Sequence, residues 1–406
     1  WKPDFGPSAF DTKRGATVIG ARDFLVAYNV NLNTTSVRRA NAIAFDVREA
    51  GRVKREGHPV TGKIVKDDKG NPLSVPGSLK SVKAIGWFIE EYGIAQISMN
   101  LTDINVTPVH IAFDEVVKKA AARGIRVTGS ELVGLIPLKS MTDAGRYFLH
   151  KQQRSSGVSE KELIKIAIRS MGLEECGQFI PEERIIEYML KESSENNLVK
   201  KTLIEFADET SAESPAPGGG SISAYVGALG ASLATMVANL SAHKQGWDDR
   251  WEEFSEIADK GEIYKQELLK LVDADAIAFN SIMQAFSLSK NSEAEKTTRT
   301  HAIQQATLRA IEIPLHVMKT AIASMYIIKK MAEKGNPNSV SDAGVGALCA
   351  RSAVMGAFLN VRINAVAYND KEFVSNVIKQ GQQMEDTAKS LETEILKIVH
   401  QRIAAI

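Results

Sequence analysis

Hydrophobic and polar residues follow two different periods along the first 150 positions. Segments in which apolar and polar residues alternate, rich in β-branched residues, predict strands, whereas apolar residues three and four positions apart predict helices. The expected strands are 16–32, 81–90, 95–101 and 125–135, and the expected helices are 36–50 and 108–123. This order is the split βαβ arrangement (βαββαβ) of an α+β domain, in which two helices cover one face of an antiparallel sheet. The other face remains free for a ligand or another subdomain.

The stretch between the first helix and the second strand, residues 51–77, has a different composition. It is rich in Gly, Pro and Lys and has no apolar period. Such a stretch is too polar to pack in a core. We therefore predict a mobile loop here.

The pattern changes after residue 190. Residues 137–171 and 181–190 have helical periods, and residues 191–197 have the polar composition of a linker. Beyond them strand signals disappear, and Pro314 is expected to kink or split its helix. We predict an α+β domain over residues 1–190, a linker over 191–197 and an all-α helical bundle over 198–406. The expected helices of the bundle are 198–208, 221–244, 251–286, 293–334, 343–367 and 371–406.

Composition and charge narrow the classes of function. The 406 residues carry 50 Lys and Arg against 49 Asp and Glu, so no global field attracts nucleic acid or a membrane surface. The uncharged stretch 221–240 contains Ser, Thr, Asn and Gly, which favours a buried central helix over a membrane span. Cys176 and Cys349 lie far apart and outside any CxxC motif, so neither a disulfide framework nor a zinc site is indicated, and we expect a cytoplasmic protein.

The sequence APGGGS at residues 216–221 precedes the small-residue helix of the bundle. Gly218, Gly219 and Gly220 at a helix start expose backbone N–H groups, and Ser221 is a candidate N-cap. The motif lacks the lysine and the preceding strand of a phosphate loop. A ligand loop and a close-packed turn both remain open on this pattern.

Two carboxylates, Asp273 and Asp275, lie two residues apart in a predicted helix. That spacing separates them by about 200° around the helix axis, so both cannot serve one pocket. Asp275 falls near the apolar stripe and Asp273 falls off it. An inward carboxylate should have a raised pKa, which suits proton transfer, although a buried acid paired to Lys or Arg is the alternative. We expect Asp273 to lie on the solvated surface.

Asn360 and Asn364 lie four residues apart on one helix face. Neutral amides at this spacing can orient a heteroaromatic ring by hydrogen bonds. They can equally join two helices.

Together these motifs resemble a known family. PDFGPSAF, GARDFLVAYNVNL, IGWFIEEYGIAQISMNLTD and GSELVGLIPL resemble the second half of a formimidoyltransferase domain, and APGGGS, LVDADAIAF, SDAGVGA and NVRIN resemble a cyclodeaminase domain. Their order matches the bifunctional formimidoyltransferase-cyclodeaminases of histidine degradation. The chain begins at Trp1 without an initiator Met, and we expect the family's N-terminal transferase subdomain, with its catalytic histidine, to be missing upstream.

The resemblance implies two reactions on tetrahydrofolate, used as a polyglutamylated co-substrate and without a metal. A formimidoyl group moves from formimidoylglutamate to N5, and N10 then attacks that carbon, expels ammonia and leaves 5,10-methenyltetrahydrofolate. Asp275 matches the family's cyclodeaminase aspartate, and the family assembles as a homo-octamer. The segment that matches the family's folate site contains Gly6, Pro7, Ser8 and Gly15, and we infer pterin contacts for the glycine turn, Ser221, Asn360 and Asn364.

Two other functions remain open. Stand-alone relatives of the helical domain act as methenyltetrahydrofolate cyclohydrolases, which add water to the methenyl product instead of releasing ammonia. A non-catalytic, folate-binding oligomeric scaffold is a third interpretation.

Overall fold

The computed structural model describes residues 2–21, 23–57, 61–190, 197–214 and 216–405. The chain forms two compact units. The sheet unit comprises Trp1–Ala144 and Ile164–Lys191, and the helical unit comprises Gly145–Leu163 and Glu192–Ile406.

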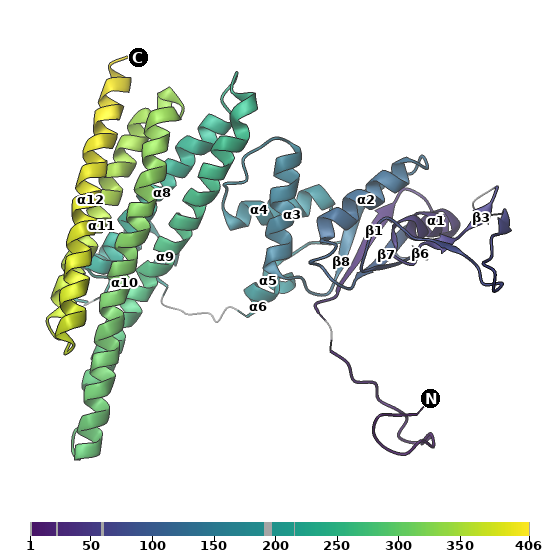
Figure 1. Ribbon diagram of the computed structural model, residues 1–406, viewed down its shortest axis with the longest axis horizontal. Coiled ribbons are helices and arrows are strands. Elements are labelled where there is room, and N and C mark those ends of the chain that lie inside the picture. The colour runs from purple at the N-terminus through teal and green to yellow at the C-terminus, as the bar shows by residue number, and fades with distance from the viewer. Residues whose placement is uncertain (1, 22, 58–60, 191–196, 215, 406) are drawn as a thin grey trace. The chain divides into compact units, whose positions relative to one another are not determined.

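The sheet unit contains a four-stranded antiparallel sheet with the strand order β6-β7-β1-β8 (Figure 1). Helix α1 joins β1 to the short strands before β6, and helix α2 joins β7 to β8. The predicted βαββαβ order and the α+β class of this part are therefore confirmed. The elements are β1 (Val26–Leu32), α1 (Val37–Val47), β6 (Val82–Ile89), β7 (Ile94–Leu101), α2 (Val109–Ala121) and β8 (Val127–Val133).

The two faces of this sheet have different chemistry. Tyr28 on β1 and Ile97 on β7 are fully buried on the face that α1 and α2 cover. Gly86 on β6 also belongs to this face, and a Cβ there would collide with the backbone of Asn41 in α1. On the opposite face the side chain of Trp87 is 43% exposed. One face is thus core. On the other, the edge strand β6 is exposed at Trp87, whereas Asn29, Asn31 and Gln96 are buried.

The Gly- and Lys-rich stretch 51–77 is more ordered than its composition predicts. Its described residues include two small antiparallel ladders, a strand pairing that the composition did not predict. Both ends of the stretch pack closely against other backbone. A Cβ at Gly51 would collide with the carbonyl oxygen of Val75, and a Cβ at Gly77 would collide with that of Arg48. The ladders pair β2 (Arg52–Val53) with β5 (Ser74–Val75), and β3 (Arg55–Glu56) with β4 (Lys63–Ile64).

The predicted helical stretch 137–171 is two helices. The connecting residues 152–159 belong to the helical unit, where the Ser155 hydroxyl donates to Asn239 over 2.7 Å and the Ser156 hydroxyl donates to Asp259 over 2.8 Å. Two short helices follow. These elements are α3 (Leu138–Lys151), α4 (Glu160–Met171), α5 (Pro181–Arg184) and α6 (Ile186–Met189).

The helical unit is an all-α bundle, as predicted (Figure 1). Its central helix α8 packs against α9, α10 and α11, and small residues allow close approach: the site of a Cβ at Gly230 lies 2.9 Å from the carbonyl oxygen of Gly346. Its elements are η1 (Leu198–Lys200), α7 (Leu203–Ser211), α8 (Gly219–Ala242), η2 (Asp248–Arg250), α9 (Trp251–Ser287), α10 (Glu293–Lys334), η3 (Pro337–Ser339), α11 (Val340–Ala365) and α12 (Lys371–Ile403).

Two details differ from the sequence prediction, and a third prediction is not tested. The first strand begins at Val26, and residues 16–21 are exposed and outside any strand. Pro314 lies inside α10 without splitting it. Residues 191–196 of the predicted linker lie outside the described residues.

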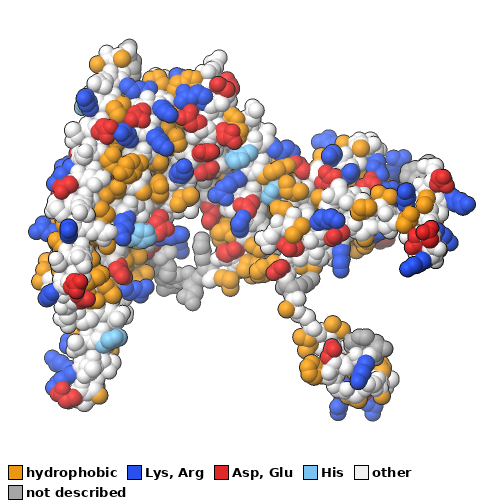
Figure 2. Space-filling model, viewed as in Figure 1, with side chains coloured by type: hydrophobic (Ala, Val, Ile, Leu, Met, Phe, Trp, Pro, Cys, Tyr) orange, Lys and Arg blue, Asp and Glu red, His pale blue; other side chains and the backbone are white. Residues whose placement is uncertain are grey.

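Three helical stretches of the bundle are long and apolar enough to cross a membrane by length and composition: Gly219–Ala242, Glu293–Lys334 and Pro337–Ala365. The buried shares of their apolar windows are 61%, 61% and 50%. Figure 2 shows hydrophobic and charged side chains mixed over the visible face of this unit.

Candidate active site of the helical unit

The glycine motif forms the first turn of α8. Gly218 is the N-cap, and no side chain on α8 caps the turn. The prediction that Ser221 is the N-cap is wrong, because the helix begins at Gly219 and Ser221 is its third residue. The hydroxyl of Ser221 points away from its own helix and donates instead to α9.

The carboxyl group of Asp275 lies against this first turn. The Ser221 hydroxyl lies 3.0 Å from Oδ2 of Asp275 and 3.1 Å from the carbonyl oxygen of Val272. A Cβ at Gly220 would collide with both carboxylate oxygens. Glycine is therefore required at this position for the carboxylate to reach the start of α8.

Burial raises the pKa of Asp275, and hydrogen bonds from the Ser221 hydroxyl and backbone N–H oppose that rise. Within the part of the chain that the structure describes, no Lys or Arg forms an ion pair with Asp275. The described residues therefore do not form the alternative, in which Asp275 is a buried acid paired to a Lys or Arg. The helix start supplies neutral donors and the positive end of a dipole instead.

Asp273 points to another side of α9. Its Oδ1 accepts a hydrogen bond of 2.7 Å from the backbone N–H of Leu198, at the start of η1. The carboxyl is half-buried, so the expectation of a solvated surface residue is wrong. Burial raises the pKa of Asp273, while the backbone N–H groups of Leu198 and Val199 oppose the rise.

The two asparagines of α11 have different partners. Asn360 donates from Nδ2 to the carbonyl of Gly356 over 2.9 Å, and this nitrogen lies 3.3 Å from the site of a Cβ at Gly219. Asn364 donates from Nδ2 to the carbonyl of Ala310 over 2.7 Å and so joins α11 to α10. The structure therefore brings Gly219, Gly220, Ser221, Asp275 and Asn360 together, and it uses Asn364 to join two helices.

The residues predicted from the N-terminal motif lie in the sheet unit. Gly6, Pro7, Ser8 and Gly15 are all exposed and lie outside helices and strands. Gly6 and Gly15 have φ of +87° and +71°, where glycine is favoured. The backbone N–H of Gly15 donates to the carbonyl of Asp11 over 2.8 Å, which closes a local turn.

A polar network on the open face of the sheet was missed at the sequence level. Gln96 donates from Nε2 to Asn31 over 2.8 Å and to Glu131 over 3.2 Å, and Asn29 donates to the same Glu131 oxygen over 3.1 Å. The alternation in VAYNVNL could have indicated this network, because it places both asparagines on the face of the sheet away from Tyr28 and Val30.

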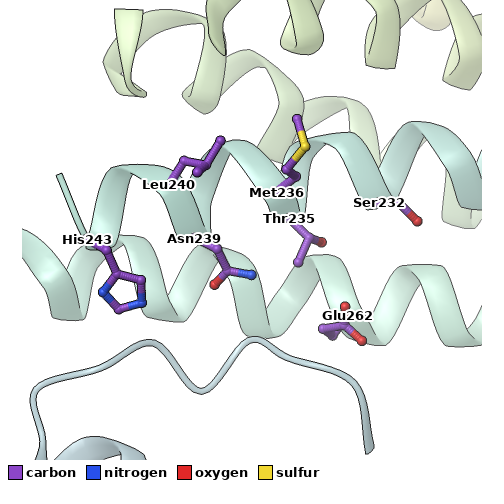
Figure 3. Close-up of a pocket in the computed structure, with 7 residues that line it drawn as sticks. All are labelled: Ser232, Thr235, Met236, Asn239, Leu240, His243 and Glu262. Atoms are coloured by element: carbon purple, nitrogen blue, oxygen red, sulfur yellow. The ribbon is translucent and has the colours of Figure 1, made fainter. Parts of the chain in front are cut away.

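A cavity of about 450 Å³ lies along the second half of α8, away from the glycine turn (Figure 3). Burial, followed by the charge of Arg154, lowers the pKa of His243 at its edge. Asp275 and Asn360 do not line this cavity, and Asn239 is already bonded to Ser155 and Gly157. Its lining residues are Ser232, Thr235, Met236, Asn239, Leu240, His243 and Glu262.

Comparisons with known proteins agree with both groups of motifs. The family model described as Formiminotransferase domain matches residues 27–191, and the model described as Formiminotransferase-cyclodeaminase matches residues 202–383. The expectation of a missing transferase subdomain gains no support from the first match.

Three relatives show how far the similarity extends. Formimidoyltransferase-cyclodeaminase of Rattus norvegicus is 37% identical over 374 residues, which cover 92% of this chain and 65% of the rat protein. The protein of the same name from Gallus gallus is 36% identical over 405 residues, 100% of this chain and 71% of its own length. Methenyltetrahydrofolate cyclohydrolase of Methylorubrum extorquens is 32% identical over 203 residues, 50% of this chain and 98% of its own length.

Proposed function

The chain belongs to the formimidoyltransferase-cyclodeaminase family, and from this premise we propose that it is a folate-dependent enzyme. Its helical unit would convert 5-formimidoyltetrahydrofolate to 5,10-methenyltetrahydrofolate and ammonia, as a lyase. Residues 1–190 would serve glutamate formimidoyl transfer, and residues 198–406 the cyclodeaminase. The observation that carries the second assignment is the Asp275 carboxyl, half-buried against a bare glycine turn and held by Ser221.

The chemistry requires one proton to change places. N10 attacks the carbon of the protonated formimidoyl group (C=NH₂⁺) and loses its proton. The nitrogen, now an amine, takes that proton and leaves as ammonia, while the lone pair of N5 replaces the broken C–N bond and leaves the methenyl cation. A single group that accepts the proton from N10 and delivers it to the leaving nitrogen serves both steps. We assign this role to Asp275, because its carboxyl lies against the glycine turn at the start of α8 and burial raises its pKa.

The neighbours of Asp275 would position it and the pterin. The Ser221 hydroxyl holds Oδ2, and the Ser221 backbone N–H also bonds the carboxyl, so both fix the carboxyl beside the helix start. Gly218 and Gly219 present no side chain toward a flat ring at the helix start. The Asn360 amide spends its Nδ2 on Gly356, so its Oδ1 is available to accept a hydrogen bond from a pterin N–H.

In the sheet unit, we assign folate contacts to the segment with Gly6, Pro7, Ser8 and Gly15, and a wall of the groove to the open sheet face. The exposed aromatic Trp87 and the polar network around Gln96 support this assignment.

The wider setting follows from the family. We assign the protein to histidine degradation in the cytoplasm, with polyglutamylated tetrahydrofolate and formimidoylglutamate as substrates and no metal requirement. The proposed homo-octamer is supported by apolar side chains exposed along α8 and α11, which a second copy would cover. They are Leu229, Met236, Leu240, Val345, Leu348 and Leu359.

The cyclohydrolase is the second candidate, because the Methylorubrum extorquens relative of that name aligns over 98% of its length. The experiment supplies the 406-residue chain with 5-formimidoyltetrahydrofolate and measures ammonia, and separately supplies 5,10-methenyltetrahydrofolate and measures its hydration. Ammonia release supports the cyclodeaminase. Hydration without ammonia release supports the cyclohydrolase, and binding of folate with neither reaction supports the scaffold.

A further inference from the structure

A second cavity lies in the sheet unit, between α1 and the stretch 51–77. Its volume is about 410 Å³, within the usual range for small-molecule sites. Four arginines line it: Arg38 on α1, Arg48 just after α1, Arg52 on β2 and Arg55 on β3. Figure 2 shows basic and acidic side chains at the end of the unit that carries β3 in Figure 1.

Three of these arginines are held in place by backbone carbonyls. Arg48 donates from Nε to Gly51 over 2.9 Å, Arg52 donates from Nη2 to Ala42 over 2.7 Å, and Arg55 donates from Nη1 to Gly62 over 2.8 Å. Each guanidinium has five N–H donors, so most of them remain available. The side chains are therefore oriented before any ligand arrives, which lowers the entropy cost of binding.

The cavity has an excess of positive charge. Arg52 forms an ion pair with Asp46, and the same carboxylate also pairs with Arg123. Among the residues that the structure describes, no carboxylate forms an ion pair with Arg38, Arg48 or Arg55, and none lines the cavity. Guanidinium groups collected without counter-charges repel one another unless an anion joins them.

The remaining wall is partly apolar. The guanidinium of Arg48 lies 4.0 Å from the centre of the Phe45 ring, and Val53 lies beside them. The side-chain amide of Asn41 already bonds Gly86: its Nδ2 donates to the Gly86 carbonyl, and its Oδ1 accepts from the Gly86 N–H. The side chains left to recognise a ligand are thus the arginines and a flat hydrophobic surface.

We propose that this cavity binds a small polyanion, with two or more carboxylate or phosphate groups, and that β2 and β3 supply part of its wall. Planar guanidinium groups recognise both kinds of oxyanion by paired hydrogen bonds. The stretch contributes Arg52 and Arg55, which gives it a role beyond a connection.

The test is calorimetric titration of the full 406-residue chain with inorganic tripolyphosphate in one arm and a pentaglutamate peptide in the other. Arg38→Glu reverses a lining charge on an exposed residue that supports no fold contact, and Arg39→Glu is its matched control, since Arg39 is exposed on the same turn but does not line the cavity. Arg55→Gln removes a second lining charge. Arg38→Glu should weaken binding by about tenfold or more, and Arg39→Glu by much less.

The arm that binds more tightly identifies the class of anion. Absence of saturable binding in both arms would overturn the proposal, as would an equal loss in the Arg38 and Arg39 variants. A loss with Arg38→Glu but none with Arg55→Gln would remove the stretch 51–77 from the site. Turnover of folate is not read, so this result is independent of the proposed enzyme activity.

Discussion

Two sides of helix α9 carry the same functional group in different surroundings. Asp273 and Asp275 are both half-buried, and burial raises the pKa of both. Asp273 faces η1, where the backbone N–H of Leu198 takes one oxygen. Asp275 faces the glycine turn of α8, where the Ser221 hydroxyl holds one oxygen and Gly219 is exposed. Burial and the direction of the pKa shift are therefore the same at both positions. What separates them is the neighbouring element, which is η1 for Asp273 and the turn with the exposed Gly219 for Asp275, the carboxylate that we propose to react.

The largest expected effect comes from replacing each of these carboxylates in turn. Asp275→Asn keeps shape and hydrogen bonding but removes the proton-transfer group, so ammonia release should fall by about 10²-fold or more. Asp273→Asn still accepts the bond from Leu198 and should leave turnover near that of wild type. Initial rates of both purified variants, with unfolding midpoints, check this. A folded Asp275→Asn protein with normal rates would end the distinction between the two sides.

The glycine turn offers a sharper test, because its two glycines face different neighbours. Gly220→Ala places a methyl group where the Asp275 carboxylate lies, so the carboxylate must move, and turnover should fall by about tenfold or more. Gly219→Ala is the comparison, since its Cβ would lie 3.3 Å from Asn360 Nδ2 and would leave the Asp275 carboxylate in place, so its effect should fall on KM, through the proposed pterin contact, and less on kcat. Rates on 5-formimidoyltetrahydrofolate compare them. Equal losses would mean that the whole turn, and not the position of Asp275, is what matters.

The sequence predicted one half of this comparison well and the other half badly. Helical phase separated Asp275 from Asp273, because about 200° between side chains is a property of any helix. It could not show that residues 198–200 fold back onto Asp273, since that contact joins positions 75 apart. The prediction of Ser221 as N-cap failed for the same reason, distance along the chain. The Ser221 hydroxyl bonds Val272 on α9, and a local sequence pattern does not show such a partner. The arginine cavity was missed because its residues look like loop and helix surface until the small ladders pair.

The pH dependence of stability should distinguish the reactive carboxylate from an amide. Burial places the pKa of Asp275 above its ordinary 3.8 in the folded state, so the folded protein binds a proton more tightly than the unfolded chain. The ionised group therefore costs stability, and that cost appears as pH rises from 3.8 through the folded pKa. Asp275→Asn should gain stability relative to wild type over that window. Urea unfolding at a series of pH values measures the difference, and a gain that is constant with pH would contradict the assignment.

The smallest effects are expected at the asparagines of α11, which repeat the contrast on another helix. Asn364→Ala removes a bond to the Ala310 carbonyl and should lower the free energy of unfolding by about 1 kcal/mol, with turnover nearly unchanged. Asn360→Ala removes an amide that bonds only within its own helix, beside Gly219, so stability should change little. If its Oδ1 orients the pterin, the KM for 5-formimidoyltetrahydrofolate should rise several-fold, as expected for one lost hydrogen bond. Measuring KM and the unfolding midpoint on both variants gives a crossed pattern if the assignment holds. A rise in KM with Asn364→Ala, or a loss of stability alone with Asn360→Ala, would exchange the two roles. The reason is that only removal of an amide that contacts the substrate should raise the KM.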